Sequence, residues 1–156
     1  MKYEDFYKHL TLQVKNLAHI GPSISIKLDS INPKISISKI GSIDPKISIF
    51  ELSPKQPLLS SKFVIFPIKI YGETLRHLNI LILNNKTKVV ERYEPFNQYL
   101  NNCQINDLIE SLLYKLMQHK KIYFLKYKTT LNTETVLNDK NCGLYCVKYV
   151  MEKIKV

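Results

Sequence analysis

Three residues of the chain have the types and positions that nucleophilic catalysis needs: Cys142, His77 and Glu94. Cys142 follows a polar, turn-prone run, 131–141, and precedes a segment with apolar residues at helical spacing. The pattern predicts a helix that begins at or near Cys142, where free N–H groups and the positive end of the helix dipole favour a thiolate. A cysteine in that position is a candidate nucleophile. The alternative interpretation is a buried structural cysteine, inert in apolar surroundings.

A predicted β-hairpin supplies the histidine and the acid that such a nucleophile requires. Two apolar runs, 78–83 and 88–93, predict strands joined by a short turn. If the turn is centred on Asn85 and Lys86, His77 and Glu94 lie directly opposite one another, with Cβ atoms about 4.5–5.5 Å apart. The carboxylate of Glu94 could then orient the imidazole and stabilise its cation. A one-residue slip would place the two on opposite faces, and each taken singly also fits an exposed position.

The remaining periodic segments predict the elements that must position these residues. Continuous apolar runs predict two further strands, at 63–68 and 122–125. Apolar residues at helical spacing predict a helix over 105–119 and an N-terminal helix over 1–18. The apolar face of that N-terminal helix is expected to consist of Phe6, Leu10, Val14 and Leu17.

An Ile/Ser-rich repeat occupies part of the N-terminal region. The unit at 30–37 recurs at 42–49, and a fragment of it stands at 23–26. The alternation of Ile and Ser predicts short strands with one apolar face, and two copies are too few for a solenoid. We therefore expect short strands or an extended arm packed on the main body, although a low-complexity insertion explains the repeat equally well. The predicted division is an N-terminal region, 1–60, and a core, 61–156.

The chain is strongly basic, with 23 Lys and Arg against 13 Asp and Glu, a formal net charge of +10. Residues 61–156 hold 15 of the basic and 8 of the acidic residues, so +7 of the excess lies there. Such an excess suggests contact with polyanions or acidic substrates, and a lysine-rich composition without functional meaning is the alternative. Weak, sequence-independent nucleic-acid binding would involve the lysines around the last strand, Lys120, Lys121, Lys126 and Lys128.

The three cysteines, Cys103, Cys142 and Cys146, argue against a secreted disulfide scaffold because their number is odd and their spacing fits no framework. The histidines form no ligand pair with them, so neither a metal nor a cofactor is expected. No apolar run reaches the roughly 18 residues of a membrane span, and residues 1–20 contain no signal-peptide core. We expect a reducing compartment, cytoplasmic or nuclear, and no membrane partner.

The order of these motifs resembles the cysteine proteases that include the SUMO-specific proteases and the adenovirus protease, especially the short forms encoded by large DNA viruses. The motifs that carry the resemblance are the strand 63–68, the histidine strand 76–82, the acid motif 91–95 and the nucleophile motif 141–146. The resemblance implies a papain-like α+β fold, with a small central mixed sheet flanked by helices and the nucleophile at a helix N-terminus.

The resemblance also implies an activity: hydrolysis of peptide or isopeptide bonds by a cysteine peptidase in which Cys142 attacks, His77 acts as base and Glu94 orients it. The implied substrates are proteins, either a viral polyprotein or a conjugate of a ubiquitin-like modifier, cleaved after a small, glycine-rich sequence. A monomer in the host cytoplasm or nucleus, or packaged in the virion, is expected. The alternative is a catalytically inactive relative that binds a ubiquitin-like protein or nucleic acid.

Three positions depart from the pattern of these proteases. Leu78 stands where the family has Trp, and Asn141 stands where it has Asp before the cysteine. The family also places Gln before the nucleophile to build the oxyanion hole, and 134–141 contains none. We expect Asn138 to supply an amide N–H to the oxyanion beside the backbone N–H of Cys142. Because losing one such donor costs about 10²–10³ in rate, a slow enzyme and an inactive relative both stay open.

Overall fold

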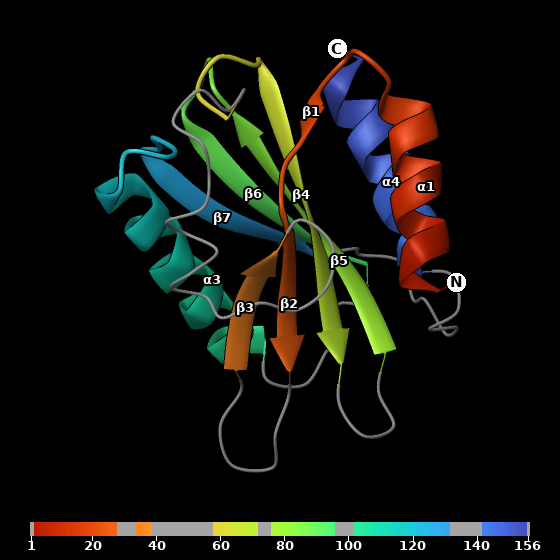
Figure 1. Ribbon diagram of the computed structural model, residues 1–156, viewed down its shortest axis with the longest axis horizontal. Coiled ribbons are helices and arrows are strands. Elements are labelled where there is room, and N and C mark those ends of the chain that lie inside the picture. The colour runs from red at the N-terminus through yellow and green to blue at the C-terminus, as the bar shows by residue number, and fades with distance from the viewer. Residues whose placement is uncertain are drawn as a thin grey trace.

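The computed structural model describes residues 2–27, 34–38, 58–71, 76–95, 102–131 and 142–155. In that part of the chain the strands form one mixed β-sheet with helices on both of its faces (Figure 1). None of the described helices is long and apolar enough to cross a membrane. The elements, in chain order, are α1 (Tyr3–Val14), β1 (His19–Ile20), β2 (Ser23–Lys27), β3 (Lys34–Ser38), β4 (Phe63–Tyr71), β5 (Arg76–Asn84), β6 (Val89–Glu94), α3 (Asn102–Gln118), β7 (Lys126–Leu131) and α4 (Cys142–Ile154).

The sheet runs in the order β3-β2-β4-β5-β6-β7, and the short strand β1 also pairs with β4. The pairs β2–β3, β4–β5 and β5–β6 are antiparallel, whereas β1 and β2 run parallel to β4, and β7 runs parallel to β6. Parallel neighbours need a long crossover connection, and helix α3 lies in the one between β6 and β7. A mixed sheet with helices on both faces confirms the predicted α+β fold class.

Two apolar layers hold the helices to the sheet. Strand side chains alternate between the two faces, so in β5 the side chains of Leu81 and Leu83 pack toward α3, while those of Leu78, Ile80 and Ile82 pack toward α1 and α4. Burying one such side chain fully is worth roughly 1.5–3 kcal/mol. In the layer between the sheet and α3, the helix contributes the buried side chains of Ile105, Ile109, Leu112, Leu113 and Leu116.

The N-terminal helix is shorter than predicted. Phe6, Leu10 and Val14 are buried as expected, but α1 ends at Val14 because Lys15 adopts a left-handed conformation, with φ of 48°. Its backbone N–H donates to the carbonyl of Thr11 and closes the last turn. Leu17, predicted on the apolar face, therefore lies beyond the helix and is 47% exposed.

The described part of the Ile/Ser repeat forms strands. The fragment at 23–26 lies in β2 and the end of the first copy in β3, and the two strands pair antiparallel, with Ile24 opposite Ile37 and Ile26 opposite Ile35. Because β2 also pairs with β4, these strands extend the central sheet. The second copy, 42–49, lies outside the described residues. The division of the chain at residue 60 stays a prediction.

The strand predicted at 122–125 is wrong, because the strand is β7, which begins at Lys126. The side chains of Ile122 and Phe124 are buried and Leu125 is exposed, so the sequence alternates as a strand does. A ladder also needs a partner, and β6 begins only at Val89, the residue paired with Lys126. Residues 122–125 therefore pack their apolar side chains under α3 without joining the sheet.

Candidate active site

His77 and Glu94 lie at the same end of the β5–β6 hairpin, since one is the second residue of β5 and the other is the last residue of β6. The imidazole Nε2 is 2.6 Å from Oε2 of Glu94 and 3.0 Å from Oε1. Both side chains are buried. The structure therefore brings together the histidine and the acid that the sequence paired.

The register of the hairpin differs from the predicted one by two residues. The ladder pairs Ile80 with Tyr93, so the position opposite Glu94 is that of Asn79, and His77 is a diagonal neighbour. Because side chains alternate along a strand, a shift of two residues keeps both groups on the same face. The predicted pair thus survives with a different geometry: the side chains meet diagonally, within reach of a long carboxylate and an imidazole.

The turn between the strands explains this shift. The side chain of Asn84 accepts hydrogen bonds from the backbone N–H groups of Lys86 and Thr87, at 2.9 and 3.1 Å. The backbone N–H of Lys88 donates to the carbonyl of Asn84, and Lys88 is left-handed, with φ of 61°. The turn therefore occupies residues 85–88, and its centre lies one residue later than expected.

Cys142 is the first residue of α4, as the sequence predicted, and its side chain is buried. Its thiol lies close enough to His77 to raise the pKa of that imidazole. Since both oxygens of Glu94 contact Nε2, the ring nitrogen left for the thiol is Nδ1. The imidazole thus contacts the carboxylate through Nε2 and has Cys142 as a neighbour that influences its pKa.

The surroundings of His77 favour its protonated form. Burial lowers the pKa of the imidazole, but hydrogen bonding with Cys142 and with the Glu94 carboxylate, which accepts from Nε2, outweighs it together with the negative charges of those groups and raises the pKa to about 9. At neutral pH the ring is therefore an imidazolium, protonated on both nitrogens. An imidazolium beside a cysteine at a helix N-terminus stabilises the thiolate.

Cys146 lies one turn further along α4 and has a different environment. Its thiol is fully buried and lies 3.6 Å from the carbonyl oxygen of Leu78, to which it donates. Burial raises its pKa well above the ordinary value, and nearby negative charges act in the same direction. Helix α4 therefore carries one thiol beside His77 and a second one in the apolar core.

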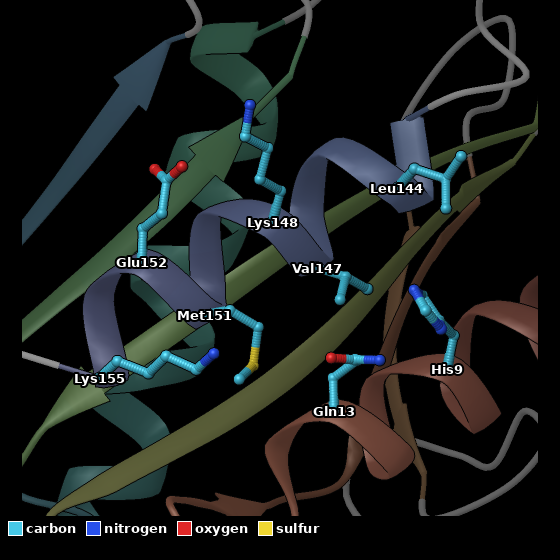
Figure 2. Close-up of a pocket in the computed structure, with 8 residues that line it drawn as sticks. All are labelled: His9, Gln13, Leu144, Val147, Lys148, Met151, Glu152 and Lys155. Carbon is cyan, nitrogen blue, oxygen red and sulfur yellow. The ribbon is translucent and has the colours of Figure 1, made fainter.

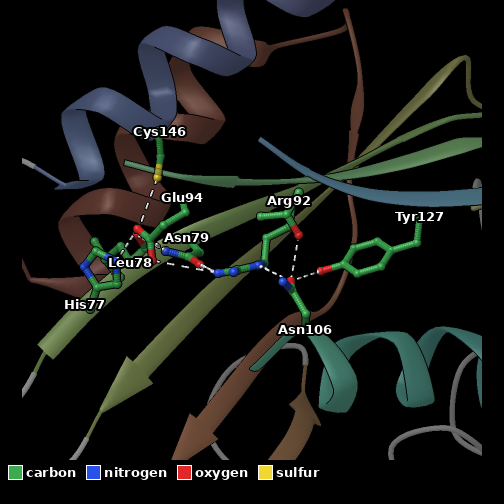
Figure 3. Close-up of polar contacts among 9 residues, drawn as sticks. His77, Leu78, Asn79, Arg92, Glu94, Asn106, Tyr127 and Cys146 are labelled. Atoms are coloured by element: carbon green, nitrogen blue, oxygen red, sulfur yellow. Dashed lines mark hydrogen bonds and ion pairs between the residues drawn. The ribbon is translucent and has the colours of Figure 1, made fainter. Parts of the chain in front are cut away.

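Two polar residues that the sequence did not single out complete the surroundings of Glu94 (Figure 3). Asn79 donates from Nδ2 to Oε2 of Glu94 at 3.3 Å, and the guanidinium of Arg92 lies 3.8 Å from Oε1. Arg92 also donates to Oδ1 of Asn79, and its side chain is 0% exposed. The available signal was strand alternation, because Val90, Arg92 and Glu94 share one face and Val90 is a core residue.

Asn138, the expected oxyanion residue, lies outside the described residues and stays a prediction. Cys103 belongs to α3. Among the described residues, no three His, Cys, Asp or Glu side chains are grouped as a metal ion would require.

Two open grooves, each of about 450 Å³, flank α4. The first lies between α1 and α4 and begins at Leu144, two residues beyond Cys142 (Figure 2). Neither Cys142 nor His77 lines it, so it is separate from the nucleophile. The second, which we call the lysine groove, lies near the β5–β6 turn and is lined by Lys62, Phe63, Ile82, Asn84, Lys86, Thr87, Val89, Glu91, Lys128 and Lys153.

No family model matches the sequence. A curated relative is the uncharacterized protein 082L of Invertebrate iridescent virus 3, which is 31% identical over 99 residues. The match covers 60% of this chain and 61% of the relative, so the chain spans less than two thirds of that protein's length.

Solved structures share the fold at low sequence identity. The C-terminal Ulp1 protease domain in complex with Smt3, the yeast orthologue of SUMO, is 13% identical and superposes with a TM-score of 0.53, over 97% of this chain and 63% of that one. A de-sumoylating protease gives the same identity and TM-score over 96% and 59%. The Legionella pneumophila effector RavZ is 12% identical, with a TM-score of 0.52 over 85% and 40%. The chain therefore has a cysteine-protease-like α+β fold of the Ulp1 type.

Proposed function

We propose that the protein is a cysteine peptidase in which Cys142, His77 and Glu94 form the catalytic triad. The observation that carries the proposal is the buried imidazole of His77, which contacts the Glu94 carboxylate and has as its neighbour a cysteine at the first position of a helix. The cysteine-protease-like fold supports the same assignment.

In the proposed reaction the thiolate of Cys142 attacks the carbonyl carbon of the scissile bond, and the carbonyl oxygen becomes an oxyanion. The backbone N–H of Cys142 at the start of α4 is one donor to that oxyanion, and Asn138 is the proposed second donor. The His77 imidazolium then donates its proton to the leaving amine, which leaves a thioester. Water, deprotonated by neutral His77, hydrolyses the thioester, while Glu94 keeps the ring oriented throughout.

The proposed substrate is a protein cleaved after a small, glycine-rich sequence, at a peptide or isopeptide bond. The two candidates are a conjugate of a ubiquitin-like modifier and a viral polyprotein. The structural similarity to a protease solved with Smt3 supports the first, and the iridovirus relative supports a viral setting. The proposed location is the cytoplasm or nucleus of the host cell, with the protein acting as a monomer.

A probe made from a ubiquitin-like protein with a vinyl sulfone or aldehyde at its C-terminus tests the proposal directly. We expect a covalent adduct on Cys142 that Cys142→Ser abolishes and His77→Ala strongly reduces. A panel of ubiquitin-like probes, together with a peptide library carrying glycine before the scissile bond, covers both substrate candidates.

A second test needs no substrate and compares the alkylation rates of the three cysteines. Iodoacetamide at neutral pH should modify Cys142 faster than Cys103 or Cys146, and His77→Ala should remove the difference. Equal labelling of all three thiols in the folded protein would refute the activated nucleophile, and with it the peptidase assignment.

The second candidate function is non-catalytic binding of nucleic acid or a ubiquitin-like protein. The observation that favours nucleic acid is the lysine groove, where four lysines surround a single glutamate. This candidate gains support if Cys142 proves unreactive while the protein retains duplex DNA at low salt.

A further inference from the structure

The carboxylate of Glu94 is shared between two cationic side chains. His77 contacts it through Nε2 at 2.6 and 3.0 Å, and the guanidinium of Arg92 lies 3.8 Å from Oε1. All three side chains are buried, so water screens these charges little. A triad needs one cation beside its acid, and this site holds a second.

Arg92 is held in place from several sides. Its guanidinium donates to Oδ1 of Asn79 and, through Nε at 3.0 Å, to Oδ1 of Asn106 on α3. The same Asn106 oxygen accepts hydrogen bonds from the hydroxyls of Tyr127 and Thr129, both at 2.7 Å, which ties α3, β6 and β7 together (Figure 3). A guanidinium does not lose its proton in a protein, so Arg92 places a permanent positive charge beside Glu94.

We propose that Arg92 is a positioning residue that sets the charge balance of the site, by neutralising Glu94 so that the proton on His77 comes from the thiol of Cys142. The proposal rests on the proposed function, because it assigns Arg92 a part in preparing that nucleophile. The S–H bond of Cys142 breaks, the N–H bond at Nδ1 of His77 forms, and no proton is exchanged with solvent.

The physical argument is the cost of net charge in a buried site. With Arg92 present, two cations (Arg92 and His77) balance two anions (Glu94 and the Cys142 thiolate). Without its charge, Glu94 and protonated His77 already balance each other, and a thiolate would add an unbalanced negative charge. The charge of Arg92 acts directly on Glu94, 3.8 Å away, and reaches Cys142 through Glu94 and His77. Removing that charge should therefore move Cys142 toward the thiol.

The charge of Arg92 reaches the elements packed around it. It acts to lower the pKa of the Cys146 thiol on α4, although burial, the larger cause, raises that pKa. It also acts to lower the pKa of Tyr127 on β7, which burial raises and the charge of Glu110 on α3 raises further. The described titratable groups on which Arg92 acts directly are thus Glu94, Tyr127 and Cys146, while His77 contacts Glu94 and neighbours Cys142, and Glu110 acts on Tyr127.

Alkylation of Cys142 by iodoacetamide across a pH series tests the proposal without a substrate. In Arg92→Gln, which removes the charge, the pH of half-maximal alkylation should rise, and the rate at neutral pH should fall severalfold. Arg92→Lys, which keeps the charge, should restore most of the wild-type profile. A merely structural role of Arg92 would not separate Gln from Lys in this way.

Asn106→Asp provides the test in a nearly isosteric variant. The new carboxylate would lie about 3 Å from Nε of Arg92 and would accept from the same donors, so it offsets the guanidinium charge without removing the side chain. The half-maximal pH should again rise, by less than in Arg92→Gln. Lys128→Gln is the matched control, because it removes a positive charge from a half-exposed side chain on β7 that pairs with Glu91, and it should leave the profile unchanged.

Two failures of this experiment have different meanings. If Cys142 in the wild-type protein reacts no faster than Cys146, the proposed function fails. If Cys142 is selectively reactive but neither Asn106→Asp nor a folded Arg92→Gln raises the half-maximal pH, the role of Arg92 is wrong and the proposed function stands. A rise with Lys128→Gln equal to that with Asn106→Asp would also overturn the specific role of Arg92.

Discussion

Strand β6 holds two glutamates in different surroundings. Glu94 ends the strand on the face toward α3, where it lies between the buried cations of His77 and Arg92. Glu91 lies on the opposite face, toward α4, and its carboxylate is 3.6 Å from Nζ of Lys128 and 3.9 Å from Nζ of Lys153. Those two lysine side chains are 46% and 47% exposed.

The comparison shows how the exposure of the partners decides what a carboxylate can do. The lysines beside Glu91 are solvated, so salt and water screen their charges and each ion pair is worth little. The partners of Glu94 are shielded from water, so their charges act strongly on one another and on the thiol at the start of α4. Of the two acids, only Glu94 has the surroundings that could influence a nucleophile.

The largest expected contrast is in catalysis. Glu94→Gln removes the charge that orients and stabilises the His77 imidazolium, and kcat should fall by about 10²–10⁴. Glu91→Gln is the matched change on the other face of the strand and should leave kcat nearly unchanged. Steady-state cleavage of the substrate found with the ubiquitin-like probes measures both. Equal losses in the two variants would erase the functional difference between the two acids.

The second contrast is in stability. Arg92→Gln leaves Glu94 with one cation fewer in a buried site, which should lower the free energy of unfolding by about 3–5 kcal/mol. Lys128→Gln breaks an exposed pair and should cost about 0–1 kcal/mol. Urea unfolding followed by circular dichroism compares the two. A loss below 1 kcal/mol for Arg92→Gln would mean that its surroundings are more hydrated than the structure indicates.

The third expectation concerns pH. The folded pKa of His77 is about 9, above its ordinary value of 6.5, so protonated His77 stabilises the fold below pH 6.5 and that contribution is lost as pH rises toward 9 and beyond. The loss should be on the order of 3 kcal/mol, since each pKa unit corresponds to about 1.4 kcal/mol. Urea midpoints of the wild type should fall across this window and those of His77→Gln should fall less. If the urea midpoints of the wild type and of His77→Gln fell equally with pH, the raised pKa of His77 would be contradicted.

The smallest expected effect is weak binding of nucleic acid around the lysine groove. Lys126 and Lys128 are both exposed on β7, and Lys128 is partly neutralised by Glu91. Glu91→Gln should therefore strengthen binding to duplex DNA slightly, and Lys128→Gln should weaken it. The logarithm of the binding constant should fall with the logarithm of salt concentration, with a slope of about −0.9 per phosphate neutralised. Fluorescence anisotropy at two salt concentrations checks this, and salt-independent binding would exclude the phosphate contacts.

Local periodicity predicted most of the sheet and the helices. The predicted strands at 63–68, 78–83 and 88–93 correspond to β4, β5 and β6, and the helix at 105–119 corresponds to α3. The proximity of His77 and Glu94 followed from the same hairpin, and it tolerated an error of two residues because strand alternation depends only on parity.

Features that depend on a single backbone angle or on a distant partner could not be predicted. The left-handed conformations of Lys15 and Lys88 shortened α1 and moved the hairpin turn, and neither residue type favours that conformation. Arginine is usually a surface residue, and the burial of Arg92 depends on partners that include Asn106, which approaches from α3 and lies outside the hairpin. The strand β7 was misplaced because its pairing with β6 joins residues far apart in the sequence.

The parallel pairing of β6 with β7 has a consequence for the order of folding. His77 and Glu94 belong to one local hairpin, whereas Cys142 follows them in the sequence beyond α3 and β7, so we expect the hairpin to close before Cys142 joins it. In that order the thiol would become reactive only when α4 docks beside His77. The alkylation rate of Cys142 during refolding would therefore report when α4 docks on the sheet.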